Sequence, residues 1–150
     1  MTSYLGVVHL TTFLSPSAAQ VISPPMLALA VVLFPIWIVL CLTTHDRREV
    51  ITFAPQWCRR LATALFVYAG FNFFACLWLL EGGNPSAKGG EFALLSHGRL
   101  IRTLTAEEYG WSRAQQLRLM SGHLLALYAV AAAGLLSNTL RPKSQDQLAS

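Results

Sequence analysis

The sequence has 150 residues, of which 54% are hydrophobic and only 12% are charged, and its net charge is +4. A soluble domain carries roughly 25% charged residues, so this composition argues against an ordinary soluble domain. The charges are unevenly placed, and three long stretches have none, which is typical of membrane spans. The positive charge does not indicate nucleic-acid binding, because the arginines cluster beside apolar stretches, where they set topology and contact lipid headgroups.

The N-terminal segment, residues 1–22, is mildly apolar and rich in Thr. Its apolar run is too short for a good membrane span. We therefore expect an interfacial or loosely ordered segment, in which His9 has no special role. The alternative is a weak additional span over residues 4–22, interrupted at Pro16.

The first transmembrane helix is predicted over residues 24–42, which contain no charge. Ser23 suits an N-cap, and Pro24 suits the first turn, where no amide donor is needed. Pro35 should kink this helix because it removes a backbone hydrogen bond. Residues 43–60 then form a loop with four arginines, which the positive-inside rule places in the cytoplasm.

The second transmembrane helix is predicted over residues 61–80. Tyr68, Asn72 and Cys76 follow one another at four-residue steps and so lie on one face, which we expect to point inward. Asn72 is expected to hydrogen-bond a neighbouring helix.

An extracytoplasmic connection is predicted over residues 81–104. Its Gly-rich part, residues 81–90, is expected to be a flexible turn region. Two short runs flank His97 and Gly98, which predicts a small β-hairpin with Gly98 at positive φ. An isolated hairpin is only marginally stable, so it must rest on the helices or the membrane.

A long helix that includes the third transmembrane segment is predicted over residues 105–137, followed by a cytoplasmic tail over residues 138–150. Thr105 and Glu108 have the spacing of a capping box. Polar residues fill the first part, and the helix is expected to enter the bilayer from Leu119 onward. Small residues at alternating four- and three-residue steps predict a seam for close approach of another helix, in the same chain or another. They are Gly122, Ala126, Ala129, Ala133 and Ser137.

A candidate polar cluster lies within the predicted spans, about one turn inside the outer membrane surface. Its histidine is either a haem or metal ligand or proton relay, or it is hydrogen-bonded to Asn72, Ser121 or a backbone carbonyl. The second interpretation is favoured, and one such histidine cannot give bis-histidine haem ligation within one protomer. The cluster consists of Asn72, Cys76, Ser121 and His123.

A second candidate cluster lies outside the predicted spans. Its arginines suit an anionic headgroup, substrate or partner protein. The alternative is a hairpin turn with ion pairs to the helix start, where acidic residues also suit the helix dipole. The cluster consists of His97, Arg99, Arg102, Glu107 and Glu108.

Other chemistry has little support in the sequence. The three cysteines are odd in number and form no C-x-x-C pair, which argues against a zinc site or disulfide framework. Patterns typical of hydrolases, zinc proteases, P-loops and dinucleotide-binding folds are absent. We therefore assign no catalytic residue and expect neither a metal nor a cofactor.

The run from His97 to Tyr109, H-G-x-x-I-R-x-L-T-x-E-E-Y, is followed by S-G-H at residues 121–123. This arrangement resembles small uncharacterised bacterial integral membrane proteins, over roughly the last third of the chain. The resemblance implies a membrane location and no particular mechanism. Those proteins have aromatic residues after S-G-H, whereas this chain has Leu124 and Leu125, which weakens the idea of an aromatic-lined cofactor site.

The sequence thus predicts an all-α membrane protein with three transmembrane helices and a small extracytoplasmic hairpin-like insert. We expect it in the cytoplasmic (inner) membrane of a bacterium, with its N-terminus outside and its C-terminus inside. The expected function is that of a non-enzymatic accessory subunit, which assembles through the small-residue seam with a second copy or a larger complex. The alternatives are a haem- or metal-binding redox protein that uses His123, and a subunit of an oligomeric transporter or channel.

Overall fold

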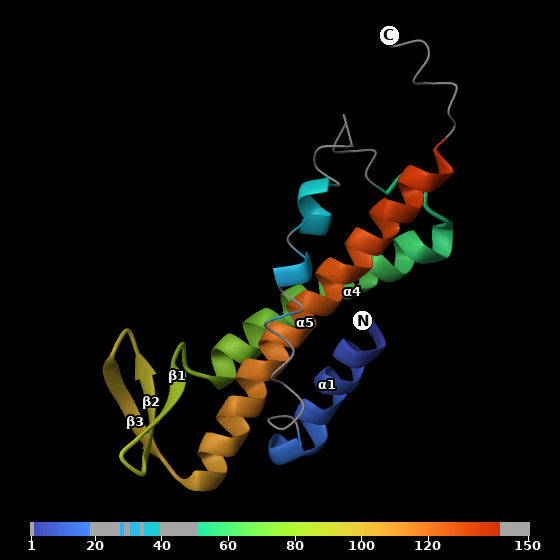
Figure 1. The fold of residues 1–150 in the computed structure, drawn as a ribbon. Coiled ribbons are helices and arrows are strands. Elements are labelled where there is room, and N and C mark those ends of the chain that lie inside the picture. The colour runs from blue at the N-terminus through green and yellow to red at the C-terminus, as the bar shows by residue number, and fades with distance from the viewer. Residues whose placement is uncertain (1, 19–27, 29–30, 34, 40–50, 142–150) are drawn as a thin grey trace.

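The computed structural model describes residues 2–18, 28, 31–33, 35–39 and 51–141. Three long helices dominate it: α1 (Thr2–Leu14), α4 (Gln56–Leu79) and α5 (Ala106–Leu140). α4 and α5 lie side by side, and α1 packs along one part of α5 (Figure 1).

Three strands lie between α4 and α5 in the chain: β1 (Asn84–Lys88), β2 (Glu91–Ser96) and β3 (Arg99–Leu104). They form an antiparallel sheet of order β1-β2-β3, which stands beside the start of α5 (Figure 1). The predicted all-α class is therefore wrong, and the protein combines helices with a three-stranded sheet.

The extra strand, β1, comes from the segment that was expected to be a flexible turn region. Gly89 and Gly90 both have positive φ and close a two-residue turn, which is the connection that hairpins favour. Pro85 is tolerated because β1 is an edge strand. The second turn has His97 and Gly98 at positive φ, so the predicted hairpin at this position is confirmed.

The prediction of three transmembrane helices is also corrected. Among the described residues, two helices, α4 and α5, are long and apolar enough to cross a membrane. The predicted first span, residues 24–42, lies mostly outside the described residues. Its described part includes Leu33, which is buried with α1 and α5.

Within the N-terminal segment, Thr2–Leu14 form the regular helix α1, where a loosely ordered stretch was one of the expectations. Leu5 and Val8 of α1 are fully buried, in a cluster with Leu124, Tyr128 and other apolar residues of α5. Burial of this apolar face explains why the segment is helical although its sequence is too short and polar for a good span.

The long helix α5 begins as predicted. Thr105 Oγ accepts a hydrogen bond from the Glu108 amide, and the Glu108 carboxylate accepts one from the Thr105 amide. The capping box is therefore confirmed. The helix continues three residues beyond the predicted end and finishes at Leu140.

The small-residue seam of α5 faces other parts of the same chain. Ala133 is buried in a cluster with Ala54, Cys58 and Ala62. Ser137 Oγ accepts a hydrogen bond from the Phe53 amide at 3.0 Å. The small side chains thus bring the start of α4 close to the end of α5.

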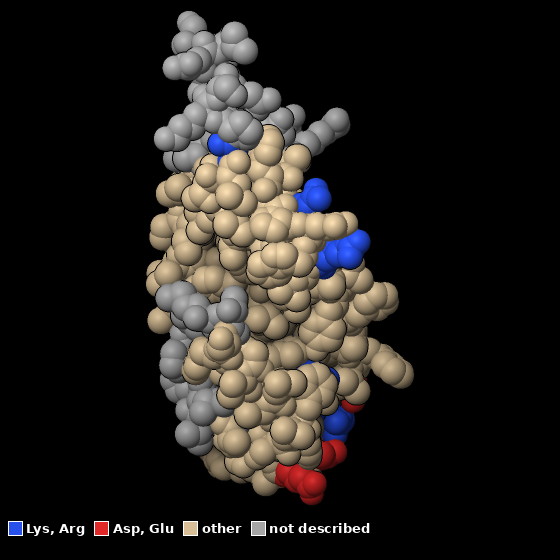
Figure 2. Space-filling view, turned by 90° about the vertical axis from the view of Figure 1, so that its right-hand side faces the viewer, with Lys and Arg blue, Asp and Glu red and all other residues tan. Residues whose placement is uncertain are grey.

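Charged side chains are unevenly distributed over the surface. On the face shown in Figure 2, Asp and Glu side chains lie near one end together with some Lys and Arg, and further Lys and Arg side chains lie toward the other end. Uncharged surface separates them. The parts of α4 and α5 that carry no charged residue are residues 61–79 and 119–140.

Candidate functional site

A buried polar network joins α1, α4 and α5, and its centre is His9. The Nδ1 atom of His9 lies 2.8 Å from Ser121 Oγ, and its Nε2 atom lies 2.5 Å from Tyr68 Oη. His9 is 5% exposed and Ser121 is fully buried. Sequence analysis assigned no role to His9, and the structure makes it the link between three helices.

The proton positions in this network follow from its acceptors. Ser121 Oγ also lies 3.3 Å from the carbonyl oxygen of Arg118, to which it donates. Ser121 then accepts from the His9 Nδ1–H, and Tyr68 donates to His9 Nε2. A neutral imidazole has one donor and one acceptor nitrogen, so this arrangement satisfies all three side chains.

Asn72 and Cys76 extend the network along α4. The amide of Asn72 donates to the Arg118 carbonyl oxygen at 3.1 Å, and Cys76 Sγ lies 3.6 Å from Asn72 Oδ1. Asn72 is 7% exposed and Cys76 is fully buried. The face of α4 that was expected to point inward is thus buried at these two positions.

Gly122 makes the close approach of the three helices possible. A Cβ atom at this position would lie 2.8 Å from Asn72 Nδ2 and 3.2 Å from His9 Cε1. Both distances are shorter than ordinary contacts, so a larger residue would force the side chains of Asn72 and His9 to shift and would disturb their hydrogen bonds.

The chemistry available to this network is limited by its burial. A serine hydroxyl within hydrogen-bond distance of a histidine is the arrangement of a nucleophile and its base. However, Ser121 has no exposed surface, and a nucleophile must reach its substrate. In this structure the network therefore stabilises helix packing, because the buried side chains of His9, Ser121 and Asn72 each have a hydrogen-bond partner.

The remaining member of the predicted intramembrane cluster, His123, lies apart from this network. Its Nδ1 atom is 2.7 Å from the carbonyl oxygen of Leu119 in the same helix. Its ring meets the ring of Phe73 edge to face at 5.4 Å. Together with Phe73, Leu119, Met120 and Leu124, it lines a small cavity of about 290 Å³. No group of three His, Cys, Asp or Glu side chains suited to a metal occurs in the described part of the chain.

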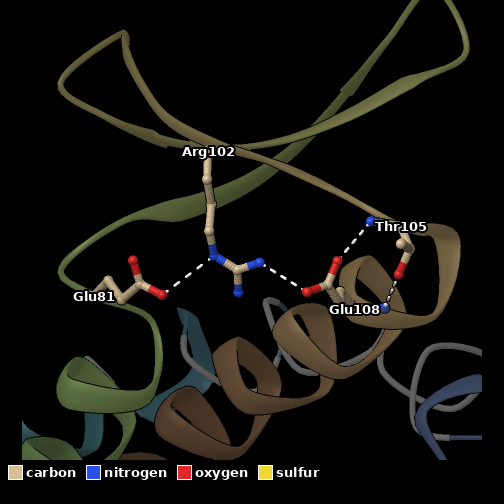
Figure 3. A network of polar contacts seen from close by, with 4 residues as sticks. All are labelled: Glu81, Arg102, Thr105 and Glu108. Carbon is tan, nitrogen blue, oxygen red and sulfur yellow. Dashed lines mark hydrogen bonds and ion pairs between the residues drawn. The ribbon is translucent and has the colours of Figure 1, made fainter.

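A second polar network lies at the base of the sheet (Figure 3). The Arg102 guanidinium on β3 binds Glu81 at 3.2 Å and Glu108 at 2.8 Å. Glu81 follows α4 and Glu108 lies in the first turn of α5, so one side chain connects the sheet to both helices. Of the predicted outer cluster, Arg102 and Glu108 are brought together, whereas His97 and Arg99 lie at the β2–β3 turn.

The charges in this second network reinforce one another. The Thr105 amide and then the Arg102 guanidinium stabilise the Glu108 carboxylate and hold its pKa below its usual value. The Glu108 carboxylate in turn raises the pKa of Arg102. The network thus stays ionised at neutral pH and fixes the sheet against the helix start.

Apolar contacts complete this junction. Phe92 of β2 stacks on Tyr109 of α5, with ring centroids 4.7 Å apart. Leu94 and Leu104 are buried in the same region. The sheet therefore has a fixed position on the helix pair and does not hang from flexible links.

His9 could have been found from its neighbours in the sequence. The buried residues Leu5, Val8, His9 and Thr12 follow the spacing i, i+3, i+4, i+7, which indicates one face of a helix. A histidine on an apolar helical face needs a hydrogen-bond partner. Glu81 gave no such signal, because its partner is set by the fold of the sheet.

Comparisons with known proteins indicate no function for this chain. No protein-family model, curated protein or solved structure matches this chain.

Proposed function

We propose that the protein is an integral membrane protein that crosses the bilayer with α4 and α5 and serves as a non-enzymatic accessory subunit. The observation that carries this proposal is the outer face of α4. Phe71, Phe74 and Trp78 each leave more than 70% of their surface exposed. In water such a face would be strongly unfavourable, whereas lipid or an apolar partner covers it.

The lengths of the two helices support membrane insertion. Residues 61–80 and 119–140 carry no charged side chain. At 1.5 Å per residue each run is roughly 30 Å long, the thickness of the hydrocarbon core. Charged residues flank both runs, as expected where a span meets the headgroups.

The arginines next to the two charge-free runs support a proposed topology. Arg59 and Arg60 precede the run in α4, and Arg141 follows the run in α5. The positive-inside rule favours the cytoplasmic side for this end. The sheet then lies outside and the C-terminus inside.

The accessory role is supported by how the polar groups are used. The hydrogen bond between Ser121 and His9 joins two packed helices, and Arg102 forms ion pairs with two carboxylates. The seam of α5 contacts the same chain. A partner, either a second copy or a larger membrane complex, would therefore meet the aromatic face of α4.

Membrane integration is tested by alkaline carbonate extraction of the full chain from its own membranes. We expect the protein to stay in the pellet and to be released only by detergent. Release into the carbonate supernatant would show that the helices do not cross the bilayer, and the proposal would fall.

Assembly is tested by photo-crosslinking in the membrane, followed by mass spectrometry in mild detergent. A photoreactive phenylalanine at Phe74 is expected to trap a second protein, whereas the same residue at Ala126 should react only within the chain, since Ala126 is 2% exposed. A bare monomer with no adduct from Phe74 would contradict the accessory role and leave only the membrane location.

A further inference from the structure

An open groove lies at the start of α4, at the end of the molecule opposite the sheet. Its volume is about 580 Å³. Most of its lining comes from the first turns of α4, at positions that recur with helical spacing. The lining residues are Ile51, Gln56, Arg59, Arg60, Thr63 and Ala64.

The two arginines of this groove, Arg59 and Arg60, form no ion pair with any residue that the structure describes. No described acidic residue lines the groove. Arg102, at the other end of the molecule, is held by two carboxylates (Figure 3). Within the described part of the chain, the groove therefore offers two guanidinium groups that no carboxylate binds, and their forked donors match phosphate oxygens.

The start of α4 adds a partial positive charge to that of the two arginines. Pro55 precedes α4, and no side chain caps the first turn. The unpaired amides of a helix start favour a negatively charged group. Gln56 and Thr63 provide neutral donors on the same face as the arginines, one on each side of them.

The groove also borders the apolar part of the molecule. The charge-free run of α4 begins directly after Arg60, and Ile51 and Ala64 give the groove an apolar wall. A small soluble anion gains no favourable contact from apolar side chains. A phospholipid does, because its headgroup is followed by a glycerol and acyl chains that continue along the helix.

We propose that this groove binds the headgroup of an anionic phospholipid, with Arg59 and Arg60 on the phosphate. This inference rests on the proposed membrane insertion, since it requires the start of α4 to lie at a membrane surface. It goes beyond that proposal by naming the ligand class and the residues that hold it.

The test uses the full-length protein reconstituted in vesicles of phosphatidylcholine with a minor share of phosphatidylglycerol. Native mass spectrometry after gentle detergent release is expected to show retained phosphatidylglycerol in preference to phosphatidylcholine. The double variant Arg59→Gln/Arg60→Gln should weaken retention about thirty-fold, the effect of removing two groups that contribute about 1 kcal/mol each. Equal retention by this variant would overturn the proposal.

A charge-matched control separates this site from general electrostatics. Lys88 and Arg99 are exposed on the sheet, and Lys88→Gln/Arg99→Gln removes the same charge from the other end. Retention should not change in this control. A loss as large as that of the groove variant would show that only net charge matters, and the site would be rejected.

The variant Arg59→Lys/Arg60→Lys keeps the charge and the topology signal but loses the forked donors. We expect retention between those of the wild type and the glutamine variant, and retention equal to the wild type would refute the forked contact. Excess inorganic phosphate is expected not to displace the lipid, and displacement would identify a soluble anion as the ligand. Carbonate extraction of each variant distinguishes this failure from a failure of membrane insertion.

Discussion

The hydrogen bond between His9 and Ser121 should be energetically significant, and a double-mutant cycle can measure it. The imidazole is 5% exposed and makes two hydrogen bonds, at 2.8 and 2.5 Å. Replacing His9 with Ala removes both bonds, at about 1 kcal/mol each, and leaves a cavity between three helices. The total loss for His9→Ala should be about 3–5 kcal/mol.

Ser121→Ala is a smaller change. It removes a fully buried hydroxyl and almost no volume, so we expect a loss of about 1 kcal/mol. In the double variant the shared hydrogen bond can be lost only once. The combined loss should therefore fall short of the sum by about 0.5–1.5 kcal/mol.

The control cycle pairs Ser121→Ala with His123→Ala. His123 bonds to a carbonyl of its own helix, so these two changes should add within about 0.5 kcal/mol. The free energy of unfolding is measured by reversible denaturant titration in mixed micelles, followed by circular dichroism. The arrangement of the three helices would be refuted if the changes at His9 and Ser121 were additive while those at His123 and Ser121 were coupled.

Three further outcomes are expected. Gly122→Ala should destabilise the protein by about 1–3 kcal/mol, because its Cβ would lie 2.8 Å from Asn72 Nδ2; an unchanged melting temperature would contradict this packing. The Thr105 amide and then the Arg102 guanidinium lower the pKa of Glu108. The stability that the Glu108 carboxylate contributes is therefore complete above about pH 4.5, and it is lost as the pH falls through the lower pKa of the folded state. Glu108→Gln should remove this part of the acid sensitivity in thermal melts, and identical pH profiles would argue against the network. Phe71→Arg should lower membrane insertion by about 2–3 kcal/mol, measured as the carbonate-resistant fraction, and full resistance would mean that this face is not in lipid.

Local signals in the sequence predicted α4, α5 and one turn, but not α1. Residues 61–80 and 105–137 correspond closely to Gln56–Leu79 and Ala106–Leu140. Long apolar runs and a capping box act within a few residues, so they can be read without knowledge of the fold. The turn at His97 and Gly98 is local in the same sense.

The strand β1 could not be predicted in this way. Its sequence, Asn84–Lys88, contains a proline and has low strand propensity. It becomes a strand because β2 offers it hydrogen bonds from Asn84 opposite Leu95 to Lys88 opposite Glu91. Pairing between strands is a tertiary interaction, and it overrides the local preference.

The polar network around His9 shows a different limit of prediction from sequence. Periodicity correctly placed Asn72 and Cys76 on one face of α4, but a face does not identify its partner. Sequence reasoning offered Asn72, Ser121 or a backbone carbonyl as the partner of His123, and the structure shows a carbonyl. Ser121 is bonded instead to His9, 112 positions away.

There is a physical reason why Ser121 is bonded to His9 and not to His123. On a helix, residues two positions apart point in different directions, so His123 cannot face the partners of Ser121. Within lipid the hydrophobic effect does not drive helices together, and close packing and hydrogen bonds must supply both affinity and orientation. Gly122 provides the close packing and His9 provides the direction, because its two nitrogens fix α1 against α4 and α5 at once. The small-residue seam and the buried histidine therefore serve the same purpose, which is to hold three helices of one chain in a single arrangement.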